Sequence, residues 1–121
     1  MNFFFDSYAV VEIIKNNPNY DKYNDFAINT STINVSEVYY FLLRTYDKKT
    51  ADYLIKKTNF KLINIIKLEM ALEASNLKFQ NRKEKLSYID CIGYVIAKML
   101  NMKFLTGDEK FRKKENVEFV K

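Results

Sequence analysis

Residues 86–111, LSYIDCIGYVIAKMLNMKFLTGDEKF, are the stretch that decides the fold expected of this chain. Ser87 and Asp90 have the S-x-x-D spacing of a capping box, which predicts that a helix begins at Tyr88. The apolar side chains of this helix recur at helical spacing and give it a broad apolar face. They are Ile89, Ile92, Val95, Ile96 and Met99.

The second half of the stretch predicts a turn, a strand and another turn. Asn101 is suited to end the helix, and residues 103–106 have the composition of a short buried strand. Gly107 then allows a sharp turn into Asp108. One carboxylate, Asp90, is therefore expected in the first turn of a helix, and a second, Asp108, just past the end of a strand.

The rest of the chain alternates between strand and helix patterns. Strands are predicted at residues 2–5, 26–30, 60–65, 103–106 and 117–120. Helices are predicted at residues 7–16, 35–46, 48–57 and 67–79 and from residue 88, with a basic loop at 80–85. The second helix is placed by the capping-box spacing of Asn34 and Glu37, and Asp47 can cap the third, so that the two form an α-hairpin. This order predicts a single domain over residues 1–121, with a mostly parallel α/β sheet of four to five strands flanked by helices.

Composition excludes several kinds of site. The 121 residues include one Cys and no His, which rules out Ser-His-Asp and Cys-His triads, His-based zinc sites and an internal disulfide. Any metal site must use oxygen ligands, which favour Mg²⁺, Mn²⁺ or Ca²⁺. The single Cys and the lack of a signal peptide predict a cytoplasmic protein, and no apolar run is long enough to span a membrane. The net charge of +5 is compatible with a nucleic-acid partner.

Four short motifs resemble those of PIN domains, in particular the VapC-type toxin ribonucleases. They are FFFDS around Asp6, INVSEV around Glu37, LSYIDCI around Asp90 and FLTGDEKF around Asp108. All four acids match in order, and the resemblance covers nearly the whole chain. It implies a PIN-like fold and a metal-dependent endoribonuclease.

The four acids are expected at the same edge of the sheet, where the strands end. A buried cluster of carboxylates repels itself, and a divalent cation, Mg²⁺ or Mn²⁺, would neutralise it and activate water for phosphodiester hydrolysis. Asp6 and Asp108 are the expected metal ligands, with Asp90 on the same or a second ion. Glu37 is expected to orient the attacking water or complete the ligand set. The alternative is that each acid separately caps a helix or a turn.

Other residues beside these acids have expected roles. Ser7 and Thr106 resemble auxiliary hydroxyl residues of the family, which bond a carboxylate or a water; the alternative is that they cap the backbone. Five cations flank the expected site and are predicted to hold an RNA backbone, although a solvated basic surface is the alternative. They are Arg82, Lys83, Lys85, Lys110 and Arg112.

The predicted function is that of a toxin ribonuclease in a type II toxin–antitoxin pair. The resemblance implies RNA as substrate, a small antitoxin as partner and a homodimer. The α-hairpin is rich in aromatic residues that would suit such an interface, namely Tyr39, Tyr40, Tyr46 and Tyr53. Two alternatives stay open: a PIN nuclease of RNA maturation, and a catalytically inactive PIN fold that binds RNA or protein.

Overall fold

A computed structural model describes residues 1–121 and contains one parallel sheet of five strands in the order β3-β2-β1-β4-β5. The strands are β1 (Phe3–Phe5), β2 (Ile28–Ser31), β3 (Phe60–Ile63), β4 (Lys103–Thr106) and β5 (Val117–Phe119). The α-helices are α1 (Ser7–Ile14), α2 (Thr32–Thr45), α3 (Lys48–Lys57), α4 (Leu68–Gln80) and α5 (Tyr88–Met99). Short 3-10 turns are η1 (Pro18–Tyr23), η2 (Arg82–Glu84) and η3 (Glu109–Phe111). The predicted α/β fold is confirmed. None of the helices has both the length and the apolar composition needed to cross a membrane.

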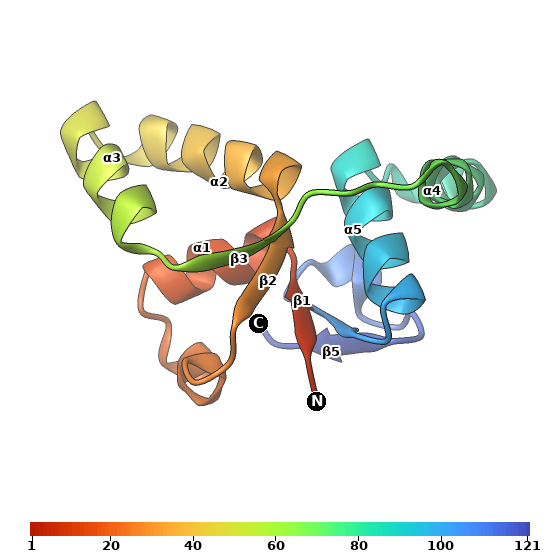
Figure 1. Cartoon of the computed structure of the whole chain (residues 1–121), viewed down its shortest axis with the longest axis horizontal. Helices are drawn as coiled ribbons and strands as arrows, with labels where there is room; N and C mark the ends of the chain where they lie inside the picture. Colours follow the sequence, from red (N-terminus) through yellow and green to blue (C-terminus); the bar gives the residue numbers. More distant parts are fainter.

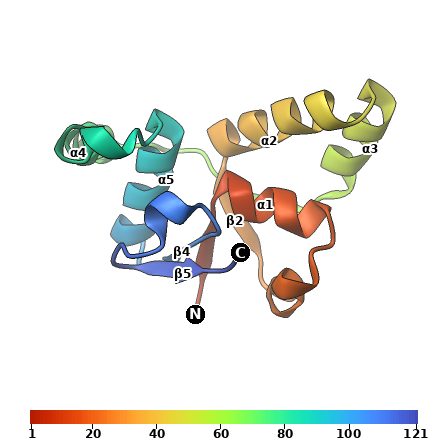
Figure 2. The same ribbon diagram turned by 180° about the vertical axis from the view of Figure 1, so that it is seen from behind.

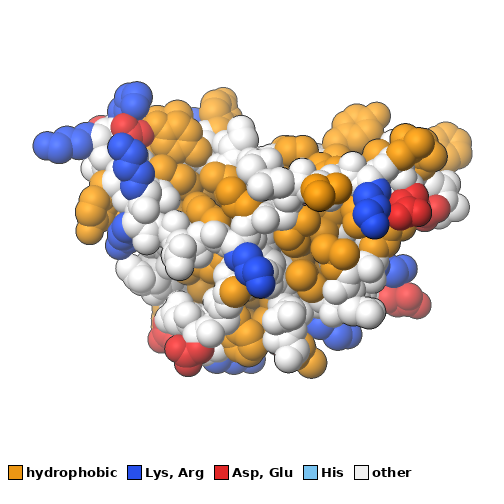
Figure 3. Space-filling model, in the orientation of Figure 1, with side chains coloured by type: hydrophobic (Ala, Val, Ile, Leu, Met, Phe, Trp, Pro, Cys, Tyr) orange, Lys and Arg blue, Asp and Glu red, His pale blue; other side chains and the backbone are white.

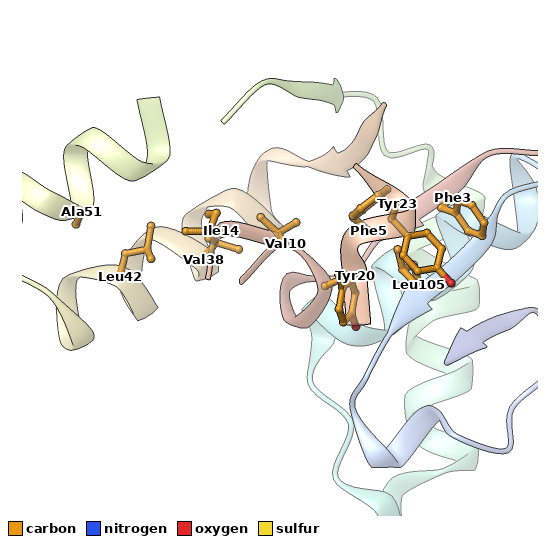
Figure 4. Packing of buried hydrophobic residues seen from close by; sticks show 11 residues of the cluster. Phe3, Phe5, Val10, Ile14, Tyr20, Tyr23, Val38, Leu42, Ala51 and Leu105 are labelled. Carbon is orange, nitrogen blue, oxygen red and sulfur yellow. The ribbon is translucent and has the colours of Figure 1, made fainter. Parts of the chain in front are cut away.

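The central strand β1 supplies side chains to both faces of the sheet, because successive residues of a strand point to opposite sides. Phe3 and Phe5 pack with α1, η1, α2 and α3 in one buried cluster (Figure 4). Phe4 packs on the other face in a second cluster, with α4, α5 and Phe104. Figures 1 and 2 accordingly show α1, α2 and α3 at one end of the molecule and α4 and α5 at the other.

Helix α5 approaches the middle of the sheet closely at Gly93. A Cβ atom at this position would lie 3.0 Å from Cε1 of Phe4 and 3.2 Å from Cε1 of Phe104. The missing side chain therefore lets the helix rest directly on β1 and β4. Asp90 lies nearly one turn earlier, in the first turn of α5. Figure 1 shows that α5 begins at the same end of the sheet as the end of β1.

Two of the predicted helix caps are confirmed. Ser87 and Asp90 form the capping box, with reciprocal hydrogen bonds of 3.0 Å between each side chain and the other residue's backbone N–H. Asp47 caps α3, and its Oδ1 accepts a hydrogen bond of 2.7 Å from the Thr50 N–H.

The predicted start of the second helix was wrong by three residues. Helix α2 begins at Thr32, and Ser31 is its N-cap, with a hydroxyl that accepts a hydrogen bond of 3.1 Å from the Asn34 N–H. Asn34 therefore lies inside the helix, and its side chain is free for contacts elsewhere. The physical reason is that Ser31, the last residue of β2, already places a capping oxygen at the point where the chain leaves the sheet.

Candidate active site

Asp6 is buried at the end of the central strand. Only 2 % of its surface is exposed, and its N–H donates a hydrogen bond of 3.0 Å to the Leu105 carbonyl of β4. Its Oδ2 atom accepts a hydrogen bond of 2.7 Å from the Thr106 hydroxyl. Its Oδ1 atom is buried and has no hydrogen-bond partner. An unpartnered buried carboxylate oxygen is costly, so it marks a place where a ligand could bind.

The environment of Asp6 raises the pKa of its carboxyl group from 3.8 to about 7. Burial is the largest cause, because it disfavours the charged form. The Thr106 hydrogen bond opposes this, whereas the charges of Asp90 and Glu37 raise the pKa further. The raised pKa of Asp6 therefore reflects burial first and the negative charges of Asp90 and Glu37 second.

Asp108 is connected to Asp6 through Thr106. The Thr106 hydroxyl that donates to Asp6 also accepts a hydrogen bond of 3.1 Å from the Asp108 N–H. Oδ1 of Asp108 accepts a hydrogen bond of 3.0 Å from the Lys110 N–H and so caps η3. A Cβ atom on Gly107 would lie 2.3 Å from both Cε1 of Tyr8 and the Val120 carbonyl oxygen. The turn that presents Asp108 therefore requires glycine.

Glu37 and Asp90 approach the same edge from two different helices. Glu37 is half-buried on α2 and lines, with Ser7, a groove of about 550 Å³ between α1 and α2. Asp90 is half-buried in the first turn of α5, where one of its oxygens is used by the capping box. Figure 3 shows a shallow hollow in the upper edge of the molecule between the ends of these two helices.

Asp6 and Asp108 follow the ends of β1 and β4, but the four acids do not form a tight cluster. The structure contains no group of three or more acidic side chains close enough together to hold a metal ion. Asp6 interacts electrostatically with Asp90 and Glu37, and Asp108 is joined to it only through Thr106. Asp90 and Asp108 also perform the capping roles that were the alternative interpretation of the sequence.

Of the two hydroxyl residues expected beside the acids, only Thr106 bonds a carboxylate. The Ser7 hydroxyl accepts a hydrogen bond of 2.9 Å from Nδ2 of Asn34. Sequence reasoning missed Asn34 because its spacing to Glu37 assigned it to a helix cap. Nothing in the sequence indicates that Ser31 takes the cap and turns the Asn34 amide towards Ser7.

Three of the five cations expected to hold RNA already have partners within the chain. The Arg82 guanidinium stacks on the Phe79 ring at 4.6 Å, and Lys110 Nζ donates to the Lys85 carbonyl at 3.2 Å. Arg112 makes two hydrogen bonds to Glu109, of 2.7 and 2.8 Å, which help to lower the pKa of Glu109 to about 2. The side chains of the other two, Lys83 and Lys85, make no hydrogen bond or ion pair within the chain.

Several solved structures share this fold. VapBC2 from Rickettsia felis, bound to a DNA fragment from its promoter, aligns with a TM-score of 0.75 and 17% identity over 100% of both chains. VapC20 from Mycobacterium tuberculosis, a sarcin-ricin loop cleaving toxin, aligns with a TM-score of 0.79 and 12% identity over 99% of this chain and 100% of that one. A toxin–antitoxin complex from Klebsiella pneumoniae aligns with a TM-score of 0.69 and 17% identity over 97% of this chain and 96% of that one. No curated protein sequence matches this chain.

The sequence itself also matches a family profile. The match is to the PIN domain and extends over residues 3–117, which includes all four acids, strands β1 to β4 and the first residue of β5. The chain therefore belongs to the PIN domain family.

Proposed function

We propose that this chain is a divalent-metal-dependent endoribonuclease and the toxin of a type II toxin–antitoxin pair. The observation that carries the proposal is the buried Asp6 carboxylate at the end of β1, which has an unpartnered oxygen and lies within electrostatic reach of two other acids. A structural cap would have its oxygens satisfied by backbone N–H groups, and no cap hydrogen bond is made by the Asp6 side chain. The membership of the PIN family and the toxin–antitoxin proteins among its structural neighbours agree with this proposal.

The donor atoms present, all carboxylate oxygens, have the chemistry that a hard divalent cation requires, and the acids would have to draw closer together to hold one. Mg²⁺ and Mn²⁺ take carboxylate oxygens and keep several waters, so Asp6 Oδ1 and one free oxygen each of Asp90 and Asp108 are suitable ligands. A bound cation would compensate the burial and repulsion that raise the pKa of Asp6. When present it supplies Lewis acidity, which activates water and stabilises charge on a phosphate oxygen.

The chain's own side chains have separate roles in this proposal. Thr106 holds one Asp6 oxygen and the Asp108 backbone, so it fixes the relative orientation of the two proposed ligands. Glu37 faces the groove and is available to orient the attacking water. Phosphodiester hydrolysis here needs neither a His nor a covalent intermediate.

RNA is the proposed substrate, held by cations of η2 and η3. Lys83 and Lys85 are the best candidates for phosphate contacts, because their ammonium groups have no partner in the chain. Arg82, Lys110 and Arg112 are proposed to contribute to the positive field while they also hold the loops in place.

A small antitoxin is the proposed protein partner, and its proposed binding site is the groove between α1 and α2. Hydrophobic residues form half of the groove lining, including Val11, Tyr40 and Phe41, and the groove runs up to Glu37. A segment bound there would lie beside the proposed site and block it. We also propose a homodimer that uses exposed aromatic residues of α2 and α3.

A binding module without catalytic activity is the second candidate. It is favoured by one observation, that the carboxylates of Asp90 and Asp108 each engage a backbone N–H as caps do. A metal-dependent nuclease of RNA maturation would share the proposed chemistry and differ in its substrate.

A nuclease assay distinguishes these candidates. The parent protein is expected to cut RNA with Mg²⁺ or Mn²⁺ and to lose this activity with EDTA. Asp6→Asn should abolish cleavage while the protein still binds RNA, because phosphate affinity comes from Lys and Arg. Asp25→Asn, at an exposed acid in the loop before β2, is the matched control and should cleave like the parent. RNA binding without cleavage under either metal would favour the binding module.

A further inference from the structure

One buried amide joins the first turn of α2 to the start of α1. Asn34 is 1 % exposed, and its Nδ2 donates a hydrogen bond of 2.9 Å to the Ser7 hydroxyl. Its Oδ1 accepts a hydrogen bond of 2.6 Å from the Ser31 hydroxyl. The side chain thus donates towards α1 and accepts from the end of β2 at the same time.

The two segments that this amide connects each carry one of the proposed functional acids. Ser7 directly follows Asp6, and Glu37 lies three residues after Asn34 in the same helix. Residues at this spacing lie on the same face of a helix, so a shift of Asn34 would move Glu37 with it. Neither the Asn34 amide group nor the Ser7 hydroxyl bonds a carboxylate itself.

The connection lies beyond the short backbone pairing of β1 and β2. The two strands have one aligned residue pair, Phe4 with Asn29. Two side chains of β2 also donate hydrogen bonds to backbone carbonyls of β1. Asn29 Nδ2 donates to the Phe3 carbonyl at 3.0 Å, and Thr30 Oγ1 donates to the Phe5 carbonyl at 2.8 Å. The Asn34–Ser7 bond continues this series past the end of the sheet, where the acids lie.

The chemistry of the contact selects asparagine. Aspartate at this position has no N–H to donate to Ser7, and it would add a negative charge beside Asp6. Alanine would remove the amide that bonds the buried Ser7 and Ser31 hydroxyls. Only backbone contacts of residue 34 would then remain, from its N–H to Ser31 at 3.1 Å and from Ser7 to its carbonyl at 3.5 Å, so the link between the α1 and α2 segments would be weaker.

We propose that Asn34 is a positioning residue, which sets the location of Glu37 relative to Asp6 through its hydrogen bond to Ser7. The proposal deepens the proposed nuclease function and rests on it. It predicts that loss of the amide weakens divalent-metal binding and turnover without removing any ligand. RNA affinity should not change, because the unpaired cations Lys83 and Lys85 lie on a different segment.

The test compares Asn34→Ala with Asn29→Ala. Both positions are buried asparagines, and Asn29 is 4 % exposed, so each change removes a buried amide hydrogen bond, but Asn29 lies within the sheet. Thermal unfolding, Mn²⁺ binding by calorimetry, and kcat and KM for RNA cleavage are measured for both. Both variants should melt at lower temperature than the parent. Only Asn34→Ala should bind Mn²⁺ about 10-fold or more weakly and lose a similar factor in kcat, with KM unchanged.

Ser7→Ala provides a second, milder variant that removes only one oxygen. It should reproduce the loss of Mn²⁺ affinity, and the double variant with Asn34→Ala should lose little more than Ser7→Ala alone, because the Asn34 amide acts through the Ser7 hydroxyl. Equal Mn²⁺ affinity in Asn34→Ala and Asn29→Ala, with a parent that binds and cleaves, would overturn the positioning role alone. A parent that binds no Mn²⁺ and cuts no RNA would overturn the proposed function as well.

Discussion

The Thr106 hydroxyl donates a hydrogen bond of 2.7 Å to Oδ2 of Asp6, and the two residues are 100 positions apart in the sequence. The same hydroxyl oxygen accepts a hydrogen bond from the Asp108 N–H. One hydroxyl group therefore joins the acids that leave β1 and β4. It also lowers the pKa of Asp6, which burial and two neighbouring charges raise.

Thr106→Val should raise the pKa of Asp6 above its value of about 7 in the parent, because the lost hydrogen bond favours the charged carboxylate. The buried oxygen would also lose its partner, at a cost of about 1–3 kcal/mol in unfolding free energy. NMR titration of the Asp6 carboxyl and chemical denaturation measure these effects. Thr106→Ser retains the hydroxyl, so a pKa shift as large as that of Thr106→Val would contradict this explanation.

The stability of the metal-free protein should fall as the pH rises from about 4 to about 7. Asp6 has a pKa of about 7 when folded and 3.8 as its ordinary value, so the folded state keeps a proton that the unfolded state has lost. Each pH unit in this window removes up to about 1.4 kcal/mol of unfolding free energy. Below the window both states are protonated, and above it both are ionised.

Denaturation curves in EDTA at pH 5 and pH 8 measure this effect. In Asp6→Asn the side chain is neutral in both states, so its stability should change less between these two pH values than that of the parent. An identical pH dependence in the two proteins would show that Asp6 ionises in the folded state as it does in the unfolded chain.

Mn²⁺ or Mg²⁺ should raise the melting temperature of the parent at pH 8, because a ligand that binds only the folded state stabilises it. The gain is about 2.7 kcal/mol at a metal concentration 100 times the Kd. Asp6→Asn should lose much of this gain, and it should melt above the metal-free parent since it no longer buries a charge among other acids. Simple capping predicts the reverse sign for the metal-free variant.

The unpaired lysines should contribute more to RNA affinity than the paired cations. Changing both Lys83 and Lys85 to Ala should weaken binding and make the negative slope of log K against log salt shallower by about 1.4, or about 0.7 for each phosphate contact with single-stranded RNA. Filter binding at several salt concentrations gives the slope. The double change Lys49→Ala, Lys56→Ala on α3, where basic side chains also gather (Figure 3), is the control and should leave the slope unchanged.

The exposed tyrosines of the α-hairpin should take part in an interface. Tyr40 and Tyr53 are 62% and 64% exposed, with cations stacked against both rings, so neither belongs to the core. Changing both to Glu should therefore leave the melting temperature of a monomer nearly unchanged and dissociate a dimer. Sedimentation equilibrium gives the mass of each protein. A parent that is monomeric at high concentration would contradict the proposed dimer.

Local signals in the sequence were sufficient for most of the fold. The Ser87–Asp90 capping box depends on residues three apart, and the apolar face of α5 depends on residues three and four apart, so both can be recognised without the rest of the chain. Parallel strands separated by helices then follow from the order of the elements. The start of α2 was predicted wrongly because Ser31 and Asn34 are both chemically able to cap a helix. Ser31 is the N-cap because β2 ends there, and the local pattern of residues did not show where that strand ends.

The sequence alone determined which acids this chain has, their order, and that Asp6 and Asp108 follow strands while Glu37 and Asp90 lie on helices. The tertiary structure alone decided the burial, the hydrogen bonds and the neighbouring charges of each acid. The unpartnered oxygen of Asp6 and its raised pKa arise from burial between β1 and β4, and from charges carried by α2 and α5. The Thr106 and Asn34 contacts likewise join residues 100 and 27 positions apart. Desolvation and hydrogen bonding depend on atoms brought together in space, so no local pattern of residues contains them.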